Sequence, residues 1–238
     1  MRVATWNLDA KGSPGAAALL STLDADVLLL TEVPVGLDLP GYDVSPSGTH
    51  LMGQGQHYAA VATRRSLAAT TVQLPSRSSS AISAAVLIGG TTYVSSVLPW
   101  GFAPDPPYRG VTQAEQTVHA VDELQPFLAA QDDLVWGGDW NHPLSGSLRG
   151  FTRIGHDRIA AALTTLDLTA HTALELTAEG CGSIDHVASR HPRQPVTRLS
   201  GRPFSPHDAY VVELGRELPA ELSGAADRPV RGTRSSSS

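Results

Sequence analysis

Acidic, amide and imidazole side chains close several short apolar runs that are spread over the whole chain. These residues are Asn7 and Asp9, Glu32, Asp139 and Asn141, Asp185, and His207. Residues so far apart in sequence come together only where strands lie side by side and end at one edge of a sheet. A pocket built from such side chains is rich in carboxylates, and pockets of this kind usually hold a divalent metal and a phosphate.

The spacing within two of the motifs fits strand ends. Residues i and i+2 of a strand point to the same face, so Asn7 with Asp9, and Asp139 with Asn141, can each aim two oxygen-bearing groups at one point. The residues between them would face the other way, into packing. Hard cations such as Mg²⁺ prefer carboxylate and amide oxygens, and the Cys- and His-rich spacing typical of zinc sites is absent.

Each motif also has an ordinary structural interpretation. Asn and Asp favour turns after strands, and a glutamate after an apolar run is commonly a solvated strand end. A lone histidine commonly packs in a core or a loop, and Asp185 beside His186 could be a surface pair. The shared order and placement of the motifs is what favours a site over this set of separate explanations.

That order resembles the endonuclease/exonuclease/phosphatase superfamily, which includes DNase I, exonuclease III-type repair nucleases, inositol polyphosphate 5-phosphatases and neutral sphingomyelinases. The resemblance runs from Met1 to about Leu214. It is carried, in order, by Thr5-Trp-Asn-Leu-Asp9, Leu30-Thr-Glu-Val33, Gly138-Asp-Trp-Asn141, Ser183-Ile-Asp-His-Val187 and Ser205-Pro-His207. It implies a four-layer α/β sandwich, in which two packed mixed β-sheets are flanked by helices and the site lies at one end of the sheets.

The resemblance also implies a role for each residue. Glu32 would be the principal ligand of Mg²⁺ or Mn²⁺, with Asn7 and Asp9 nearby. Asp139 would orient or deprotonate the attacking water. Asn141 would hydrogen-bond the phosphoryl oxygens.

The closing motifs complete the implied site and contain two departures from the family's pattern. His207 would contact the scissile phosphate or act as acid or base, and Asp185 would orient it and stabilise its charge. The family's closing Asp is Pro206 here, and Asp208, on the other side of His207, is the candidate replacement as a metal ligand. Val97 stands where the family often has a His or Tyr near the phosphate.

These residues predict a divalent-metal-dependent phosphoesterase that hydrolyses a phosphodiester or phosphomonoester by in-line attack of an activated water. Two alternatives stay open. One is a DNA or RNA nuclease of the same superfamily. The other is a phosphate-binding module whose catalysis is degraded, which Pro206 and Val97 motivate. The expected partner is a phosphate-containing substrate, either a small molecule or nucleic acid. The oligomeric state is left open, with a monomer as the default.

Length, composition and net charge limit the number of domains and the class of substrate. A chain of 238 residues that is 41% hydrophobic can bury a good core in one domain. We expect that domain at residues 1–214, followed by a partly disordered tail at 215–238 that is rich in Pro, Gly, Ser and Arg. The formal net charge of −6 modestly favours a small substrate, because nucleic-acid binders usually carry a basic surface.

The arginines, the single cysteine and the apolar stretches bear on the lining of the pocket and on the cellular compartment. Four arginines could line one side of the pocket or simply solvate a loop, namely Arg190, Arg193, Arg198 and Arg202. The single cysteine, Cys181, allows no intrachain disulfide. We expect no signal peptide, because Met1 and Arg2 lead straight into the first predicted strand, and no apolar stretch approaches transmembrane length. We therefore expect a cytoplasmic, soluble protein with no membrane partner.

The hydrophobic pattern predicts the elements that position these residues. Strands are expected at 3–7, 27–31, 42–44, from 134, 184–188, 197–199 and 209–214, and helices at 15–23, 112–130 and 157–166. The segments 58–63, 70–74, 81–88 and 92–98 read as successive strands of a meander, with a hairpin turn at Gly89 and Gly90.

Two groups of residues with ring side chains lie near the predicted site in sequence. The role of the first group is left open, and the second group is given no role. The loop at 99–110 carries Trp100, Phe102 and Tyr108, which either stack on a base or sugar or pin the loop to the body. His142 and His186 adjoin site residues, but strand alternation turns each of them away from its neighbour, so neither is assigned a role.

Overall fold

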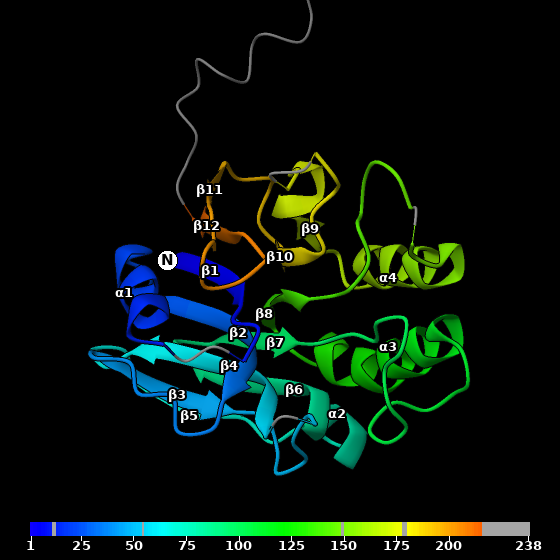
Figure 1. Ribbon diagram of the computed structural model, residues 1–238, viewed down its shortest axis with the longest axis horizontal. Coiled ribbons are helices and arrows are strands. Elements are labelled where there is room, and N and C mark those ends of the chain that lie inside the picture. Colours follow the sequence, from blue (N-terminus) through cyan, green and yellow to red (C-terminus); the bar gives the residue numbers. More distant parts are fainter. Residues whose placement is uncertain (11–12, 54, 149, 178–179, 216–238) are drawn as a thin grey trace, which may run out of the picture.

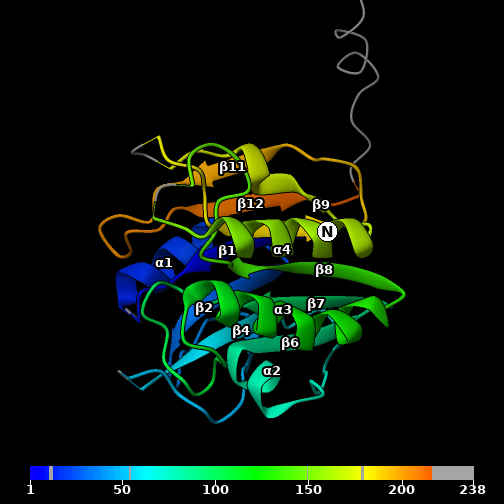
Figure 2. The same ribbon diagram turned by 90° about the vertical axis from the view of Figure 1, so that its right-hand side faces the viewer.

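Two six-stranded β-sheets pack face to face, with helices on their outer surfaces (Figures 1 and 2). This computed structural model describes residues 1–10, 13–53, 55–148, 150–177 and 180–215. The tail expected at 215–238 therefore lies, apart from Gly215, outside the described residues. The arrangement confirms the four-layer α/β sandwich.

The first sheet has the order β11-β12-β1-β2-β4-β3. Its strands are β11 (Val196–Leu199), β12 (Ala209–Glu213), β1 (Arg2–Asn7), β2 (Val27–Pro34), β4 (Gln56–Arg64) and β3 (Tyr42–Pro46). The strands β1 and β2 are parallel, and the other neighbours are antiparallel.

The second sheet has the order β5-β6-β7-β8-β10-β9. Its strands are β5 (Ala69–Thr71), β6 (Ser83–Ile88), β7 (Thr91–Ser96), β8 (Asp133–Asp139), β10 (Asp185–Ser189) and β9 (Thr169–Ala170). Here β7 and β8 form the parallel pair. Both sheets are therefore mixed, as the sequence predicts.

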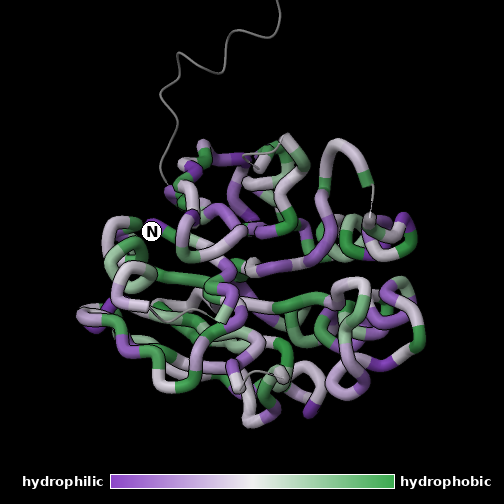
Figure 3. The backbone as a smooth tube through the Cα atoms, in the orientation of Figure 1, coloured by the Kyte–Doolittle hydropathy of each residue, from purple (hydrophilic) through white to green (hydrophobic). Residues whose placement is uncertain are grey.

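The strand β2 shows why its sequence is apolar without alternation. Its residues from Val27 to Leu30 are all fully buried. Val27 and Leu29 pack between the two sheets, whereas Leu28 and Leu30 pack on the outer face beneath the first helix. A strand covered on both faces needs apolar residues at every position, and Figure 3 shows the resulting hydrophobic colour along the central strands.

Helices cover both outer faces. The helix α1 (Pro14–Thr22) lies on the first sheet, and α2 (Arg77–Ile82), α3 (Gln113–Ala129) and α4 (Arg153–Thr165) lie on the second (Figure 2). A short 3₁₀ helix spans His171–Leu174. Thr112 and Glu115 form a capping box that begins α3. Within the described ranges, no helix has both the length and the apolar character that a membrane crossing requires.

The meander expected after residue 58 is wrong in two respects. The strand β4 pairs with β2 and β3 in the first sheet, because its two faces are both apolar and fit a central position there. In addition, residues 77–82 form α2, so β6 begins only at Ser83. Ser76 caps this helix by accepting a hydrogen bond from the Ser79 backbone N–H at 3.0 Å.

Other boundaries differ by a few residues. The helix α4 begins at Arg153 rather than 157, because the Thr152 side chain caps it by accepting from the Gly155 N–H. The strand β5 ends at Thr71, three residues before the expected end. The hairpin turn at Gly89 and Gly90 is confirmed, with positive φ values of 56° and 93°.

A glycine pair lets neighbouring strands approach the end of β8. A Cβ on Gly137 would lie 2.4 Å from the His186 carbonyl oxygen, and one on Gly138, whose φ is 114°, would lie 2.3 Å from that of Ser96. Glycine is therefore required at both positions, because the flanking strands β7 and β10 leave no room for a Cβ. The close packing brings the ends of three strands together where the site forms.

Candidate active site

The sheets bring all five motifs to one edge of the sandwich. The parallel strands β1 and β2 both run toward this edge, where Asn7 pairs in register with Thr31, next to Glu32. In the second sheet the antiparallel pairing of β8 and β10 places Asp139 directly opposite Asp185. Pairing between strands thus joins residues that are distant in sequence.

Glu32 reaches the space between the sheets because its backbone leaves the regular strand conformation. Its φ of 50° is rare for a residue other than glycine. Side-chain alternation inverts there, since Leu28, Leu30 and then Val33 pack on the outer face. Asp9 and Asn141 also have positive φ values, of 47° and 50°. Such strained residues concentrate at functional sites.

The amide of Asn7 joins the carboxylates of the two sheets. Its Nδ2 donates to Glu32 Oε1 and to Asp139 Oδ2, both at 2.9 Å. Its Oδ1 accepts from the Asp9 backbone N–H at 2.8 Å, which fixes the orientation of the amide. Asn7 is fully buried, and it holds two acidic groups together by donating to both. The Asn7 Oδ1 points toward the Asp9 backbone and away from the two carboxylates.

Asp139 is a buried carboxylate with a strongly altered acidity. Burial and the charge of Asp185 raise its pKa to about 7, although His207 and hydrogen bonds from Asn141 and Asn7 act in the opposite direction. The Asn141 N–H donates to Asp139 Oδ1 at 2.9 Å. A carboxylate with a pKa near neutrality can both take and release a proton at working pH.

His207 and Asp185 form a close pair. Asp185 Oδ2 lies 2.7 Å from His207 Nδ1, and the Asp185 side chain is 4% exposed. Burial alone would lower the pKa of His207, but the charge and hydrogen bond of Asp185, with the charges of Asp139 and Glu32, raise it to about 10. His207 is therefore an imidazolium at neutral pH, and Asp185 fixes its orientation.

These side chains border a cleft of about 450 Å³. Its lining includes Glu32, Asp139, Asn141 and His207. The Asn141 side chain also donates to the Leu98 carbonyl at 2.9 Å, which holds it at the rim. Four of the predicted residues therefore share one opening, and Asn7 and Asp185 support them from behind.

Sequence interpretation missed part of this lining. Met52, Gly53, Gln56 and Ile184 also border the cleft. Gln56 is 5% exposed, and its Oε1 is buried with no hydrogen-bond partner. A polar residue at the start of an apolar strand is a weak signal, and only the pairing of β4 with the end of β2 brings Gln56 beside the site.

In the loop at 99–110 the structure shows a residue that pins the loop to the body, whereas stacking on a base or sugar stays a prediction. Tyr108 is buried and donates its hydroxyl proton to the Val97 carbonyl at 2.9 Å, which pins the loop. Trp100 borders the cleft and meets Tyr108 edge to face. Phe102 is 96% exposed.

The donor set suits a hard divalent cation. Glu32 and Asp139 present carboxylate oxygens to the cleft, and Asp185 Oδ1 and Gln56 Oε1 are buried oxygens without a hydrogen-bond partner. Oxygen ligands of this kind match Mg²⁺ or Mn²⁺. Asp139, Asp185 and His207 also offer ligand atoms within 4.8 Å of one another. The Nδ1 of His207 is already engaged by Asp185, however, which favours an acid–base role for the imidazole.

Other predicted residues lie outside the cleft lining. Asp208 has its Oδ2 3.8 Å from Arg198 Nε. Val97 packs in the apolar cluster beneath α3 and α4. Arg190 donates to the Gln131 and Asp132 carbonyls at the opposite end of β8. Within the described part of the chain, none of the four clustered arginines borders the cleft.

His186 is buried on the outer face of β10, turned away from Asp185 as strand alternation predicts. Its Nε2 donates to the His142 carbonyl at 3.0 Å, and its Nδ1 lies 3.1 Å from the Thr172 hydroxyl, which also accepts from the Val187 N–H. The Thr172 hydroxyl proton therefore points at Nδ1. Burial lowers the pKa of His186 to about 4, so its neutral form is the native one.

This depressed pKa predicts a pH-dependent contribution to stability. Since the folded-state pKa lies below the ordinary 6.5, the contribution of His186 is complete above 6.5 and declines as the pH falls toward 4. Between pH 7.5 and 5, wild type loses about 2 kcal/mol that a His186→Gln variant does not lose. Urea unfolding of both proteins at each pH measures this change, and a stability difference that is constant with pH contradicts it.

Two mixed sheets with outer helices, and a carboxylate–histidine cleft at one edge of both sheets, define the DNase I-like class of α/β sandwiches. The chain belongs to the endonuclease/exonuclease/phosphatase family, whose family model matches residues 4–215. It is thereby placed in a family of nucleases and phosphatases. No curated protein matches the chain.

Solved structures share this fold. The endonuclease domain of TRAS1, a telomere-specific non-LTR retrotransposon, is 20% identical with a TM-score of 0.61, over 90% of this chain and 99% of that one. An AP endonuclease from Archaeoglobus fulgidus is 16% identical with a TM-score of 0.65, over 90% and 98%. The 3′ phosphatase NExo from Neisseria, bound to a product DNA hairpin, is 14% identical with a TM-score of 0.66, over 90% and 98%. These are likenesses of fold.

Proposed function

We propose that the protein is a divalent-metal-dependent phosphoesterase that hydrolyses a phosphodiester or phosphomonoester by in-line attack of water. The observation that carries this proposal is the shared cleft, where the Glu32 and Asp139 carboxylates, joined by Asn7, face the imidazolium of His207. Attack on a phosphate ester needs a proton acceptor for water on one side and positive charge on the other.

Glu32 is the proposed principal metal ligand, with Asp139 beside it. A bound Mg²⁺ or Mn²⁺ supplies positive charge to the phosphate oxygens and acidifies a nearby water. Asn7 acts by position, because its Nδ2 keeps both carboxylates in place. Asp9 completes the turn that orients Asn7.

Asp139 is the proposed general base, which orients the attacking water and accepts its proton. Its pKa of about 7 suits that exchange. Asn141 stands at the rim to donate to a phosphoryl oxygen. His207 donates from its ring to the phosphate or to the leaving oxygen, and Asp185 keeps the imidazole charged and oriented.

The organisation of the cleft argues against a binding module with degraded catalysis. Pro206 removes one carboxylate, and Asp208 lies against Arg198 instead of bordering the cleft. The Asp185–His207 pair and the Asn7 junction are nevertheless fully formed. A carboxyl group of raised pKa beside a carboxylate–histidine pair is an arrangement that favours acid–base catalysis.

The proposal is tested by offering substrates to the purified protein. The panel is bis-p-nitrophenyl phosphate, p-nitrophenyl phosphate, and labelled DNA and RNA, each with Mg²⁺, Mn²⁺ or EDTA. We expect turnover of at least one substrate that EDTA abolishes. Activity that persists in EDTA would refute metal dependence, and the absence of turnover on every substrate would refute the proposal.

The pairing of His207 with Asp185 predicts that Asp185→Asn shifts the alkaline limb of the pH–rate profile. Since protonated His207 and ionised Asp139 are the active forms, wild-type kcat should fall below about pH 7 and should decline on the alkaline side only as the pH rises toward about 10. Asp185→Asn removes the charge that does most to raise this pKa, so the alkaline decline should move down toward 6.5 and kcat at pH 8 should fall by up to about 30-fold.

Asp208→Asn is the matched control, because Asp208 is the neighbouring acid that faces Arg198. We expect it to leave the alkaline limb in place. Equal displacement of that limb by both variants would contradict the assignment of Asp185 as the partner of His207.

A further inference from the structure

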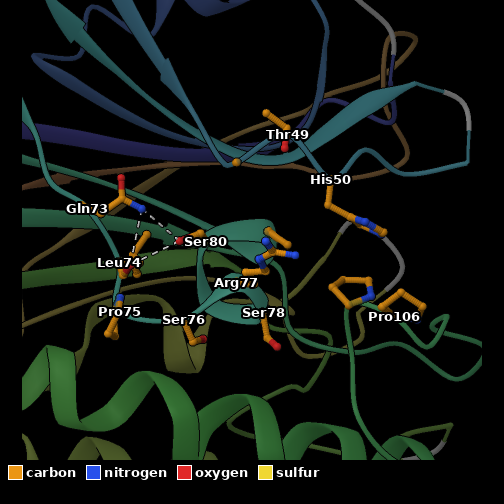
Figure 4. A pocket seen from close by; sticks show the side chains of 13 residues that line it. Thr49, His50, Gln73, Leu74, Pro75, Ser76, Arg77, Ser78, Ser80 and Pro106 are labelled. Atoms are coloured by element: carbon orange, nitrogen blue, oxygen red, sulfur yellow. Dashed lines mark hydrogen bonds between the residues drawn. The ribbon is translucent and has the colours of Figure 1, made fainter.

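A second and larger hollow, of about 870 Å³, opens near the cleft and has a different chemical character. Arg77, at the start of α2, extends into it toward His50 and Pro106 (Figure 4). No acidic side chain of the described ranges lines this hollow. Among the described residues, Arg77 forms no hydrogen bond or ion pair, so its guanidinium is open to an anion.

Residues with hydroxyl groups line the same hollow as Arg77. Thr49 and Ser78 line the hollow, and within the described part of the chain neither side chain is engaged in a hydrogen bond. Ser80 also lines the hollow, but its hydroxyl proton is donated to the Leu74 carbonyl, so it does not add a donor for an anion. Arginine with hydroxyl donors is a combination that binds phosphate oxygens. The cleft has the opposite character, since its carboxylates require a cation.

A series of ring contacts joins the hollow to the cleft. The ring of His50, which lines the hollow, stacks on Tyr58 with centroids 6.1 Å apart. Tyr58 meets Tyr108 edge to face at 5.9 Å, and Tyr108 meets Trp100, which borders the cleft, at 5.9 Å. The two tyrosines are buried, whereas His50 is exposed and Trp100 is half-buried.

We infer that this hollow is a second phosphate subsite, and that the substrate is a nucleic-acid strand that crosses from the cleft past Trp100 and His50 to Arg77. The inference rests on the proposed function, because the cleft must take the scissile phosphate. Phosphates separated by stackable rings are the repeat of a nucleic-acid strand, and bases stack on aromatic side chains irrespective of sequence. A single small phosphodiester fills only the cleft.

The test measures strand binding apart from hydrolysis. A fluorescein-labelled single-stranded oligonucleotide of about ten nucleotides is titrated with protein in EDTA, and fluorescence anisotropy gives the Kd. We expect Arg77→Gln to weaken binding about fivefold, and to make the dependence of log K on log salt shallower by about 0.7. Arg77→Lys, which keeps the charge, should restore much of the affinity.

Arg65→Gln is the matched control. Arg65 is exposed, follows β4 at the opposite end of the first sheet, and pairs with Asp43 at 3.2 Å. It should leave binding unchanged. In Mg²⁺, Arg77→Gln should lower kcat/KM for the oligonucleotide about fivefold and leave that for bis-p-nitrophenyl phosphate unchanged, because the latter has one phosphate.

Equal Kd values for wild type and Arg77→Gln would overturn the inference, whatever the activity toward the small ester. Parallel losses on both substrates would also overturn it, since they would indicate damage to the cleft. A wild-type protein that binds the strand through Arg77 but hydrolyses neither substrate would refute the proposed function and leave the subsite standing.

Discussion

Asp139→Ala is expected to lower kcat about 1,000-fold or more, because it removes the group that orients and deprotonates water. Asp139 receives hydrogen bonds from both Asn7 and Asn141, and both its oxygens are therefore positioned. Initial rates at saturating substrate and fixed Mg²⁺ measure the loss. A variant with near-wild-type kcat would remove Asp139 from the mechanism.

The same variant should fold at least as stably as wild type above neutral pH. Burial and the charge of Asp185 raise the pKa of Asp139 from 3.8 to about 7. A carboxyl group whose folded-state pKa is raised loses stability as the pH rises from its unfolded-state pKa of 3.8 to its folded-state pKa of about 7, so the cost is complete above pH 7. The melting temperature of Asp139→Ala at pH 8 should therefore equal or exceed that of wild type. A marked fall at pH 8 would show that the lost activity reflects misfolding.

Glu32→Gln is expected to remove the response to metal while keeping the shape of the side chain. The amide that replaces the carboxylate is a neutral and weaker ligand for Mg²⁺. A metal contributes several kcal/mol to the transition state, so kcat/KM in Mg²⁺ should fall about 1,000-fold. Excess Mg²⁺ should recover part of the rate if Glu32 acts through metal affinity.

A readout independent of activity separates this role from a structural one. A ligand that binds only the folded state raises the melting temperature as its concentration increases. Mg²⁺ should raise the melting temperature of wild type and of Arg65→Gln, whose substitution lies at the opposite end of the sheet. It should not raise that of Glu32→Gln. Equal Mg²⁺-dependent shifts in all three proteins would exclude Glu32 as the principal ligand.

The sandwich and the order of its site residues could be predicted because the relevant information is local. The ends of apolar runs mark where Asn7 and Asp139 leave their strands. The family's motifs supply the order in which such ends meet. Alternation also placed His186 away from the site, where the structure has it.

The orientation of individual groups could not be predicted, because it depends on backbone conformation and strand pairing. Regular alternation would turn Glu32 to the outer face, and a φ of 50° brings it inward. Asn7 holds carboxylates through its nitrogen because the Asp9 N–H occupies its oxygen. Gln56 reaches the cleft only because β4 joins the first sheet and pairs with β2.

The missed elements have a similar cause. The segment 77–82 is rich in serine, a weak helix former, and its helix depends on the Ser76 cap. The strand β4 carries the same two-sided apolar pattern as β2, and that pattern indicates a central strand. It does not indicate which sheet the strand enters.

The most direct test of the account is the initial rate of bis-p-nitrophenyl phosphate hydrolysis by wild type, Asp139→Ala and Glu32→Gln, purified side by side and assayed in Mg²⁺ and in EDTA. The account predicts an EDTA-sensitive rate for wild type and rates at least 100-fold lower for both variants. Equal rates in all three preparations, or a wild-type rate that EDTA leaves unchanged, would contradict it.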